Sequence, residues 1–162
     1  MQLTLVRHGE AAPPVNGNDI KRPLTARGHA QAEQTATFLK DIVKPDIFVV
    51  SPLLRAQETL AHIQTYFKDV PVLLCDKIKP DDDAKEAIEW LSQIPYESIV
   101  VVCHMNVVGH IAELLTHENF NPFALAEARI YDQAVIANGL STQKNSFIPT
   151  ISLPFTGGAA SP

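Results

Sequence analysis

The sequence predicts an α/β fold with three layers, in which helices cover both faces of a mostly parallel central sheet. Short apolar runs alternate with stretches of helical periodicity through most of the 162 residues. Several of those runs are continuously apolar, which is typical of parallel strands buried on both faces. Strands that alternate with helices favour this doubly covered sheet. The length is sufficient for one domain with a substantial core.

The first predicted strand begins at Leu3 and carries an arginine and a histidine to its end, where Gly9 turns the chain. A loop with two prolines and a glycine follows over residues 11–21. Thr25 is a favourable N-cap for a helix, and the apolar residues after it recur at helical spacing. Pro45 ends this helix.

The second predicted strand covers residues 47–50, and Ser51 and Pro52 provide an N-cap and a first helical position. A third strand is predicted over residues 70–74. The run of aspartates at residues 81–83 suits the N-terminus of a third helix, which Pro95 ends.

Residues 99–103 give the strongest strand signal and lead directly to His104, and Asn106 is placed to cap the helix after it. Two later strands are predicted over residues 134–137 and 147–153, with a turn near Asn138. We therefore expect one domain over residues 1–153 and a flexible C-terminal tail over residues 154–162.

Composition excludes several classes of protein. The chain is 46% hydrophobic and 19% charged, which is ordinary for a soluble globular protein. No apolar run approaches the ~20 residues that a membrane span needs, and no secretory signal pattern opens the sequence. The net charge of -5 argues against nucleic-acid binding. Only Cys75 and Cys103 are present, too few for a disulfide framework. We expect a cytoplasmic protein without membrane or nucleic-acid partners.

Three strand-to-helix junctions carry the residues that are candidates for chemistry. The first has Arg7 and His8, the second has Arg55 in the first turn of a helix, and the third has His104. In a parallel sheet these junctions share one edge, where ligands bind. Guanidinium groups and helix N-termini both suit phosphate oxygens. Because neutral imidazole is a nucleophile near neutral pH, this edge is suited to phosphoryl transfer.

These residues resemble the motifs of a known family. Arg7-His8-Gly9 after the first strand, residues 51–59 and His104 after a valine-rich strand are similar to the three motifs of the histidine phosphatase superfamily, the phosphoglycerate mutase-like enzymes. The chain is too short for the helical insert of the sugar-phosphate mutases. Residues 22–25 and 101–109 resemble the corresponding segments of its short bacterial phosphohistidine phosphatases.

The resemblance implies a role for each of these residues. His8 is the nucleophile and becomes transiently phosphorylated, and water then hydrolyses this intermediate. Arg7, Arg22 and Arg55 bind the phosphoryl oxygens. His104 completes the pocket and stabilises the transferring group. No metal ion and no organic cofactor is implied.

One departure from the family pattern bears on the substrate. Many members have a glutamate after the third strand that protonates an alkoxide leaving group, but residues 76–83 contain none. Asp76 and the aspartates at residues 81–83 remain open as alternative acids. An imidazole leaving group, whose conjugate acid has a pKa of ~6.5, needs much less help to depart.

The function expected is therefore a phosphohistidine phosphatase. Its partner would be a phosphorylated protein, such as a histidine phosphotransfer domain in a bacterial signalling relay, and the enzyme itself a monomer. A metal-independent phosphatase of a small phosphorylated metabolite is the alternative. A non-catalytic phosphohistidine- or phosphate-binding module is the third possibility.

Two residues that lie next to the motifs, Cys103 and Glu10, are interpreted as structural rather than catalytic. A phosphatase with Cys103 as nucleophile would need an arginine shortly after it, and residues 104–109 contain none. Cys103 is therefore expected to be a buried strand residue. Glu10 is expected to have a structural or solvated role.

Overall fold

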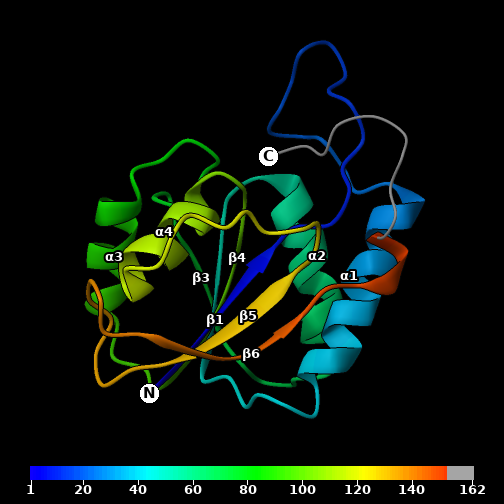
Figure 1. Ribbon diagram of the computed structural model, residues 1–162. Coiled ribbons are helices and arrows are strands. Elements are labelled where there is room, and N and C mark those ends of the chain that lie inside the picture. Colours follow the sequence, from blue (N-terminus) through cyan, green and yellow to red (C-terminus); the bar gives the residue numbers. More distant parts are fainter. Residues whose placement is uncertain (153–162) are drawn as a thin grey trace.

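The computed structural model describes residues 1–152, in which six strands form one sheet with helices on both faces (Figure 1). The strands are β1 Gln2–Arg7, β2 Ile47–Val50, β3 Val72–Leu74, β4 Ser98–Cys103, β5 Ala128–Asp132 and β6 Thr142–Phe147. The helices are α1 Ala26–Leu39, α2 Leu54–Gln64, α3 Ala84–Ser92 and α4 Val107–Thr116, followed by the short 3₁₀ turn Thr150–Ser152. The predicted α/β class is confirmed.

The strand order is β3-β2-β4-β1-β5-β6. β3, β2, β4 and β1 are mutually parallel, whereas β5 runs antiparallel to both β1 and β6. In the register between β1 and β4, Arg7 lies opposite Cys103. The next residues of these neighbouring strands, His8 and His104, therefore emerge side by side at one edge.

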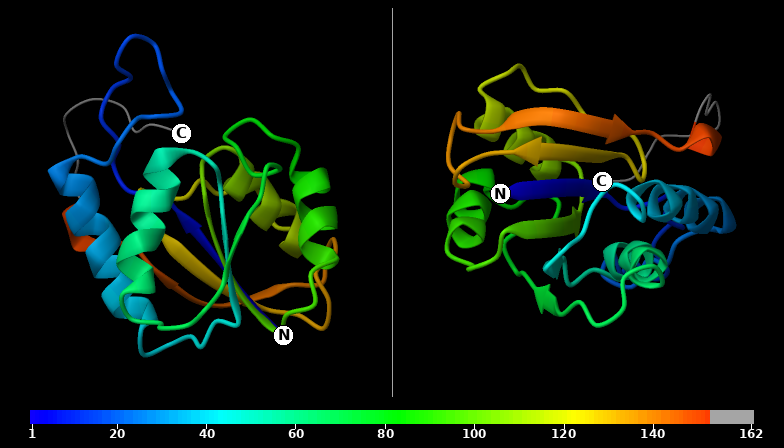
Figure 2. Two further views of the ribbon diagram at one scale, coloured as in Figure 1. Left: turned by 180° about the vertical axis from the view of Figure 1, so that it is seen from behind. Right: turned by 90° about the horizontal axis from the view of Figure 1, so that it is seen from below.

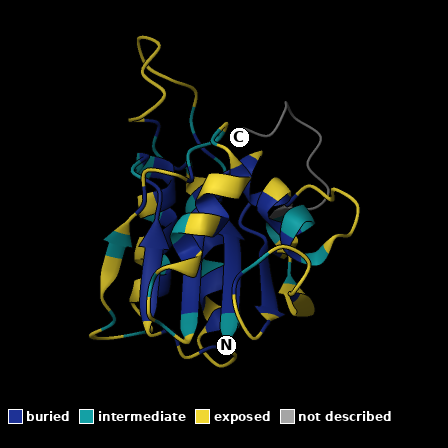
Figure 3. Ribbon diagram, turned by 90° about the vertical axis from the view of Figure 1, so that its left-hand side faces the viewer, coloured by how far each residue is buried: buried dark blue, intermediate teal, exposed yellow. Residues whose placement is uncertain are grey.

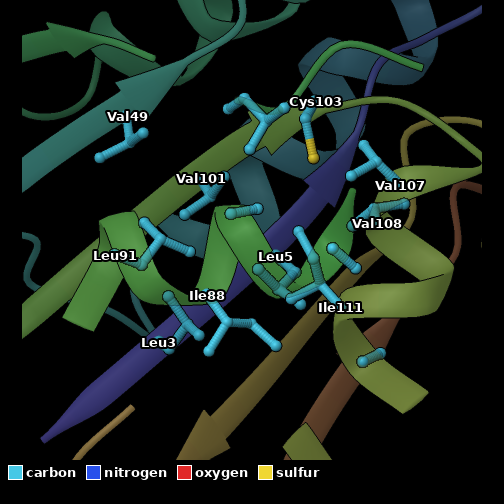
Figure 4. Close-up of a cluster of buried hydrophobic side chains, with 14 of the residues drawn as sticks. Leu3, Leu5, Val49, Ile88, Leu91, Val101, Cys103, Val107, Val108 and Ile111 are labelled. Atoms are coloured by element: carbon cyan, nitrogen blue, oxygen red, sulfur yellow. The ribbon is translucent and has the colours of Figure 1, made fainter. Parts of the chain in front are cut away.

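Two hydrophobic clusters hold the sheet between its helices. α1 and α2 cover one face and α3 and α4 the other (Figures 1 and 2). Successive strand residues alternate between the clusters: Leu5 and Val101 pack toward α3 and α4, and Val6 and Val102 toward α1 and α2. Figure 4 shows the first cluster, and Figure 3 shows that the central strands are buried along their length.

This packing fixes the position of the sheet edge from which His8 and His104 emerge. Burying a large aliphatic side chain contributes about 1.5–3 kcal/mol, and β4 buries all of residues 99–103. The ends of β1 and β4 are thus anchored on both faces.

The helix starts were predicted with mixed success. Thr25 caps α1 as predicted, since its hydroxyl oxygen accepts a hydrogen bond from Gly28 N at 3.0 Å. The predicted start of α2 is wrong: Ser51 is not the N-cap, and the helix begins at Leu54 after the N-cap residue Leu53. The Ser51 hydroxyl contacts His104 instead. Asn106 occupies the N-cap position of α4 without a capping hydrogen bond from its side chain.

The predictions for the last two strands are wrong. Residues 134–136 form a bend and residue 137 is irregular, and the actual strand β5 lies earlier. Arg129 interrupts the apolar pattern of β5, yet it is buried because it pairs with Glu127 at 2.6 Å and stacks on Phe123. β6 is a mostly polar edge strand that ends at Phe147, where the predicted strand was to begin. The third strand is shorter than predicted.

Two further expectations concern the ends and the environment of the chain. Residue 153 and the predicted tail over residues 154–162 lie outside the described residues. Within residues 1–152, no helix is both long enough and apolar enough to cross a membrane.

Candidate active site

The two motif histidines lie against each other at the C-terminal edge of the sheet. Both are fully buried, and their ring centroids are 5.1 Å apart with the rings tilted by 58°. His8 extends the ladder beyond β1, since its backbone N–H donates to Cys103 O at 3.0 Å. On the other side of β4, Ser51 N donates to Val102 O. We call Arg7, His8, Ser51 and His104 the floor of the site.

The hydrogen bond of His8 defines its tautomer. Its Nδ1 lies 2.6 Å from Gly9 O. A carbonyl oxygen can only accept, so Nδ1 carries the ring proton. The lone pair of the neutral ring is then on Nε2. This is the form that a nucleophilic imidazole needs.

His104 is oriented by Ser51. Its Nε2 lies 2.7 Å from Ser51 Oγ, which also accepts a hydrogen bond from Leu53 N at 3.2 Å. We assign the hydroxyl hydrogen to His104 Nε2 and the ring proton to Nδ1. Nδ1 is buried and has no hydrogen-bond partner among residues 1–152. It is therefore a donor suited to a phosphoryl oxygen.

The electrostatic environment keeps His104 neutral in the absence of a ligand. Burial first, and then the electrostatic interactions with His8, Arg55 and Arg7, hold the pKa of His104 far below its usual range. The neutral ring still offers one N–H to an anion.

Two glycines let the end of β1 approach α1 closely. A Cβ on Gly9 would lie 2.5 Å from Gly28 O, and a Cβ on Gly28 would lie 2.0 Å from Glu10 O. Thr59 fastens α2 to the same turn, since its hydroxyl accepts from Gly9 N and donates to Arg55 O. The motif residues around His8 and Arg55 are thus joined by direct hydrogen bonds.

Three guanidinium groups accompany the histidines. Arg7, Arg22 and Arg55 are only 5%, 7% and 1% exposed. Burial lowers the pKa of Arg7 to about 10, with Glu127 opposing this effect and Arg55 adding to it. Burial likewise lowers the pKa of Arg55. Clustered, desolvated cations favour a dianion such as a phosphoryl group.

Arg22 joins the cluster from the loop over residues 10–24, which projects beyond this edge of the sheet (Figure 1). Its Nε donates to Ala12 O at 2.8 Å. Its charge contributes to the low pKa values of both His104 and Arg55. The structure thus brings all five predicted site residues to one place.

Asp19 is a site residue that the sequence analysis missed. Its Oδ1 lies 3.1 Å from Arg22 Nη1, and its Oδ2 lies 3.4 Å from Arg55 Nη2. Its backbone oxygen accepts from Arg55 Nη1 at 2.9 Å. The sequence offered one signal for Asp19: it lies three residues before Arg22, with which it forms an ion pair. We call Asp19, Arg22 and the loop that carries them the rim of the site.

The candidate acids are engaged as anions or acceptors. A hydrogen bond from Lys79 lowers the pKa of the exposed Asp76 carboxyl group. Asp82 also pairs with Lys79, at 3.0 Å, and Asp83 caps α3. Asp81 accepts a hydrogen bond from the side chain of Asn106.

Two structural interpretations from the sequence agree with the contacts. Cys103 is fully buried, and burial raises the pKa of its thiol to about 12, which opposes a nucleophilic role. Glu10 accepts a hydrogen bond from the Thr25 hydroxyl at 2.8 Å. Among residues 1–152 there is no group of three or more His, Cys, Asp or Glu side chains that could hold a metal ion.

A cavity of about 350 Å³ adjoins Arg55 and is lined by Asp19, Arg55, Lys79, Pro80, Asp81 and Asp82. A larger hollow of about 620 Å³ lies among Gln2, Ser98 and Asp132, at the opposite edge of the sheet. It contains none of the predicted site residues. The smaller cavity is therefore the one relevant to substrate.

Comparisons with known proteins identify the family of the chain. The model of the histidine phosphatase superfamily (branch 1) matches residues 3–79, which include the motifs at His8 and Arg55. The chain is 32% identical over 143 residues to the phosphohistidine phosphatase SixA homolog of Haemophilus influenzae, covering 78% of this chain and 87% of the relative. It is 31% identical over 125 residues to phosphohistidine phosphatase SixA of Escherichia coli, covering 73% and 76%.

A solved structure of the protein histidine phosphatase SixA complexed with tungstate superimposes with a TM-score of 0.81 at 25% identity, covering 92% of this chain and 97% of that chain. The identity and coverage of the relatives and the likeness of the folds lead to one conclusion. The chain belongs to the histidine phosphatase superfamily, branch 1, and is a phosphatase of that family.

Proposed function

We propose that this phosphatase hydrolyses phosphohistidine on a partner protein through a phosphorylated His8. The observation that carries the proposal is the combination of a paired-histidine floor with carboxyl groups that are held as anions. Lys79 lowers the pKa of Asp76, and Asp19 pairs with Arg22 and Arg55. An alkoxide leaving group would need a proton donor that these groups do not supply, whereas imidazole departs without one.

The reaction follows from the geometry of the floor. His8 Nε2 attacks phosphorus, while Arg7, Arg22 and Arg55 neutralise the phosphoryl oxygens. His104 Nδ1–H donates to one of these oxygens and counters the charge that develops there. The Gly9 carbonyl holds the Nδ1 proton of His8, which stabilises the phosphorylated ring. Water then attacks phosphorus, and the bonding electron pair returns to His8 Nε2.

The relatives support the choice of substrate class. The relatives from Haemophilus influenzae and Escherichia coli are named as a phosphohistidine phosphatase homolog and a phosphohistidine phosphatase. We propose the same substrate here, carried by a histidine phosphotransfer domain of a signalling relay, with the reaction in the cytoplasm. A side chain presented by a folded protein could approach along the projecting loop of the rim (Figure 1).

The test compares turnover of a phosphohistidine-bearing phosphotransfer protein with turnover of a simple phosphate monoester, in the presence of a chelator. We expect a much larger kcat/KM for phosphohistidine. Faster hydrolysis of the monoester would contradict the proposal and favour a metabolite phosphatase. Binding of either compound without phosphate release would favour a binding module.

A further inference from the structure

Asp19 is an anion held on the solvent side of a cluster of buried cations. Its side chain is 55% exposed, whereas the side chains of its partners Arg22 and Arg55 are 8% and 1% exposed. His8 is fully buried. In an in-line displacement the leaving group departs on the side opposite the nucleophile. With His8 at the floor, that departure is toward the rim, where Asp19 lies.

The carboxyl group of Asp19 is ionised. Desolvation opposes this, but hydrogen bonds and charges from Arg22 and Arg55 together keep the pKa of Asp19 below its usual value. Asp19 can therefore accept hydrogen bonds at neutral pH but cannot supply a proton. A phosphoryl dianion bound by the same two arginines would lie beside a second anion, which repels it.

Phosphohistidine carries a group that relieves this repulsion. When its phosphorylated imidazole is protonated on the other ring nitrogen, the ring offers a positively charged N–H. The alcohol portion of a simple phosphate monoester offers no such charge. A carboxylate at the rim therefore favours the first substrate over the second.

We propose that Asp19 is a specificity-determining residue that accepts the N–H of the substrate's imidazole ring. This inference rests on the phosphohistidine phosphatase activity proposed above. As His8 Nε2 bonds to phosphorus, the P–N bond to the substrate breaks and its electron pair stays on the substrate nitrogen. The ring leaves as neutral imidazole and keeps the proton on its other nitrogen. No proton passes to or from the enzyme in this step.

The floor contains a matching hydrogen bond for the attacking ring, which is the imidazole of His8. His8 keeps its distal proton on Nδ1, where Gly9 O accepts it at 2.6 Å. Asp19 would accept a hydrogen bond from the distal N–H of the leaving ring, as Gly9 O accepts one from Nδ1 of the attacking ring. The displacement would then be nearly symmetrical, between two imidazoles whose distal N–H groups each meet an oxygen acceptor.

The space beside Asp19 suits a ring of this size. The cavity that Asp19 and Arg55 line has a volume of about 350 Å³, and it is open to solvent. Lys79 on its wall is occupied by Asp76 and Asp82 at 2.8 and 3.0 Å. Asp19 is thus the carboxylate of this cavity that contacts the arginines of the phosphoryl site.

The variant Asp19→Asn removes the charge with little change in shape. We expect kcat/KM for the phosphohistidine protein to fall at least about tenfold, the size of effect typical of a lost hydrogen bond to a charged group. The kcat/KM for a phosphate monoester should stay level or rise, and inorganic phosphate should bind more tightly. Asp19→Glu, which keeps the carboxylate, should restore part of the preference.

The matched control is Asp46→Asn, which makes the same charge change where the carboxylate accepts a hydrogen bond from Ser98 N. It should leave the ratio of the two activities unchanged. An equal fall for both substrates in Asp19→Asn would overturn the proposal and show that Asp19 only holds the arginines. A wild-type enzyme that prefers the monoester would instead refute the proposed function itself, and the Asp19 inference with it.

Discussion

The floor and the rim of the active site are held by different forces. His8 and His104 sit at the ends of neighbouring strands whose side chains are buried on both faces of the sheet. Asp19 and Arg22 lie on a loop that ion pairs and a few hydrogen bonds hold against Arg55. The comparison indicates that the fold fixes the positions of the reacting groups. In our proposal, substrate selection is left to the loop that carries Asp19 and Arg22, which lies outside the two hydrophobic clusters.

The largest effect is expected from His8→Ala on the floor. Removing the nucleophile should reduce turnover of phosphohistidine by about 10⁴-fold or more, because no other group can form the intermediate. The measurement is steady-state phosphate release, with inorganic phosphate affinity and the melting temperature as controls. Substantial turnover in this variant would refute the role of His8. Retained binding with lost turnover would exclude a pure binding module.

Arg55→Lys tests the residue that joins the floor to the rim. Lysine keeps the charge but not the planar fork of donors, and it cannot reproduce the contacts of Arg55 with both Asp19 O and Asp19 Oδ2. We expect kcat/KM to fall by about 10²–10³-fold, the range for losing one donor to the transition state. A loss below about threefold would show that Arg55 acts only as a general positive charge.

Ser51→Ala tests whether the Ser51 hydroxyl orients His104 within the floor. His104 Nε2 would lose its 2.7 Å partner, so the ring proton would no longer be confined to Nδ1. We expect kcat to fall about tenfold with KM nearly unchanged, equivalent to a barrier about 1.4 kcal/mol higher. Ser51→Thr, which keeps the hydroxyl, is the control. A variant that raises KM alone would assign Ser51 to substrate binding instead.

The smallest effect is expected outside both regions, at the contact between α1 and α2. Glu33 accepts hydrogen bonds from Tyr66 and from His62 Nδ1, the second at 3.0 Å. Tyr66 first and His62 second lower the pKa of Glu33 from the usual value of 4.5. The pKa of Glu33 is lower in the folded protein than in the unfolded chain. The hydrogen bonds of ionised Glu33 therefore stabilise the fold above about pH 4.5, and this stabilisation disappears as the pH falls through the folded pKa.

Glu33→Gln should therefore reduce the free energy of unfolding by less than about 1 kcal/mol at pH 7, since the pair is partly exposed. The difference from wild type should shrink as the pH falls below the pKa of Glu33. Urea unfolding at several pH values measures it. A change in kcat/KM would contradict the separation of this contact from the site.

The sequence predicted the floor well because its signals are local. An apolar run followed by Arg7 and His8, and a valine-rich run followed by His104, each specify a strand and its end. In a parallel sheet such ends meet at one edge. The role of Ser51 was misassigned because the serine-proline pair also matches a helix start. Only the neighbouring strand shows that its hydroxyl meets His104.

The rim and the last strands depend on contacts that local patterns do not encode. Asp19 reaches Arg55 across a separation of 36 residues, through a loop with no periodic pattern. Arg129 interrupts the apolar pattern of β5, and a buried cation is unusual in a strand. Its pairing with Glu127 and its stacking 3.8 Å from the centre of the Phe123 ring make that burial possible.

The central claim is the phosphorylated His8, and trapping it is the most direct test. The enzyme is mixed with a phosphohistidine-bearing protein, quenched within milliseconds under alkaline conditions and analysed by peptide mass spectrometry. We expect one phosphoryl group on the peptide that contains His8, labile to acid, and none in the His8→Ala variant. Phosphate release without this intermediate, or a phosphoryl group on another residue, would contradict the account.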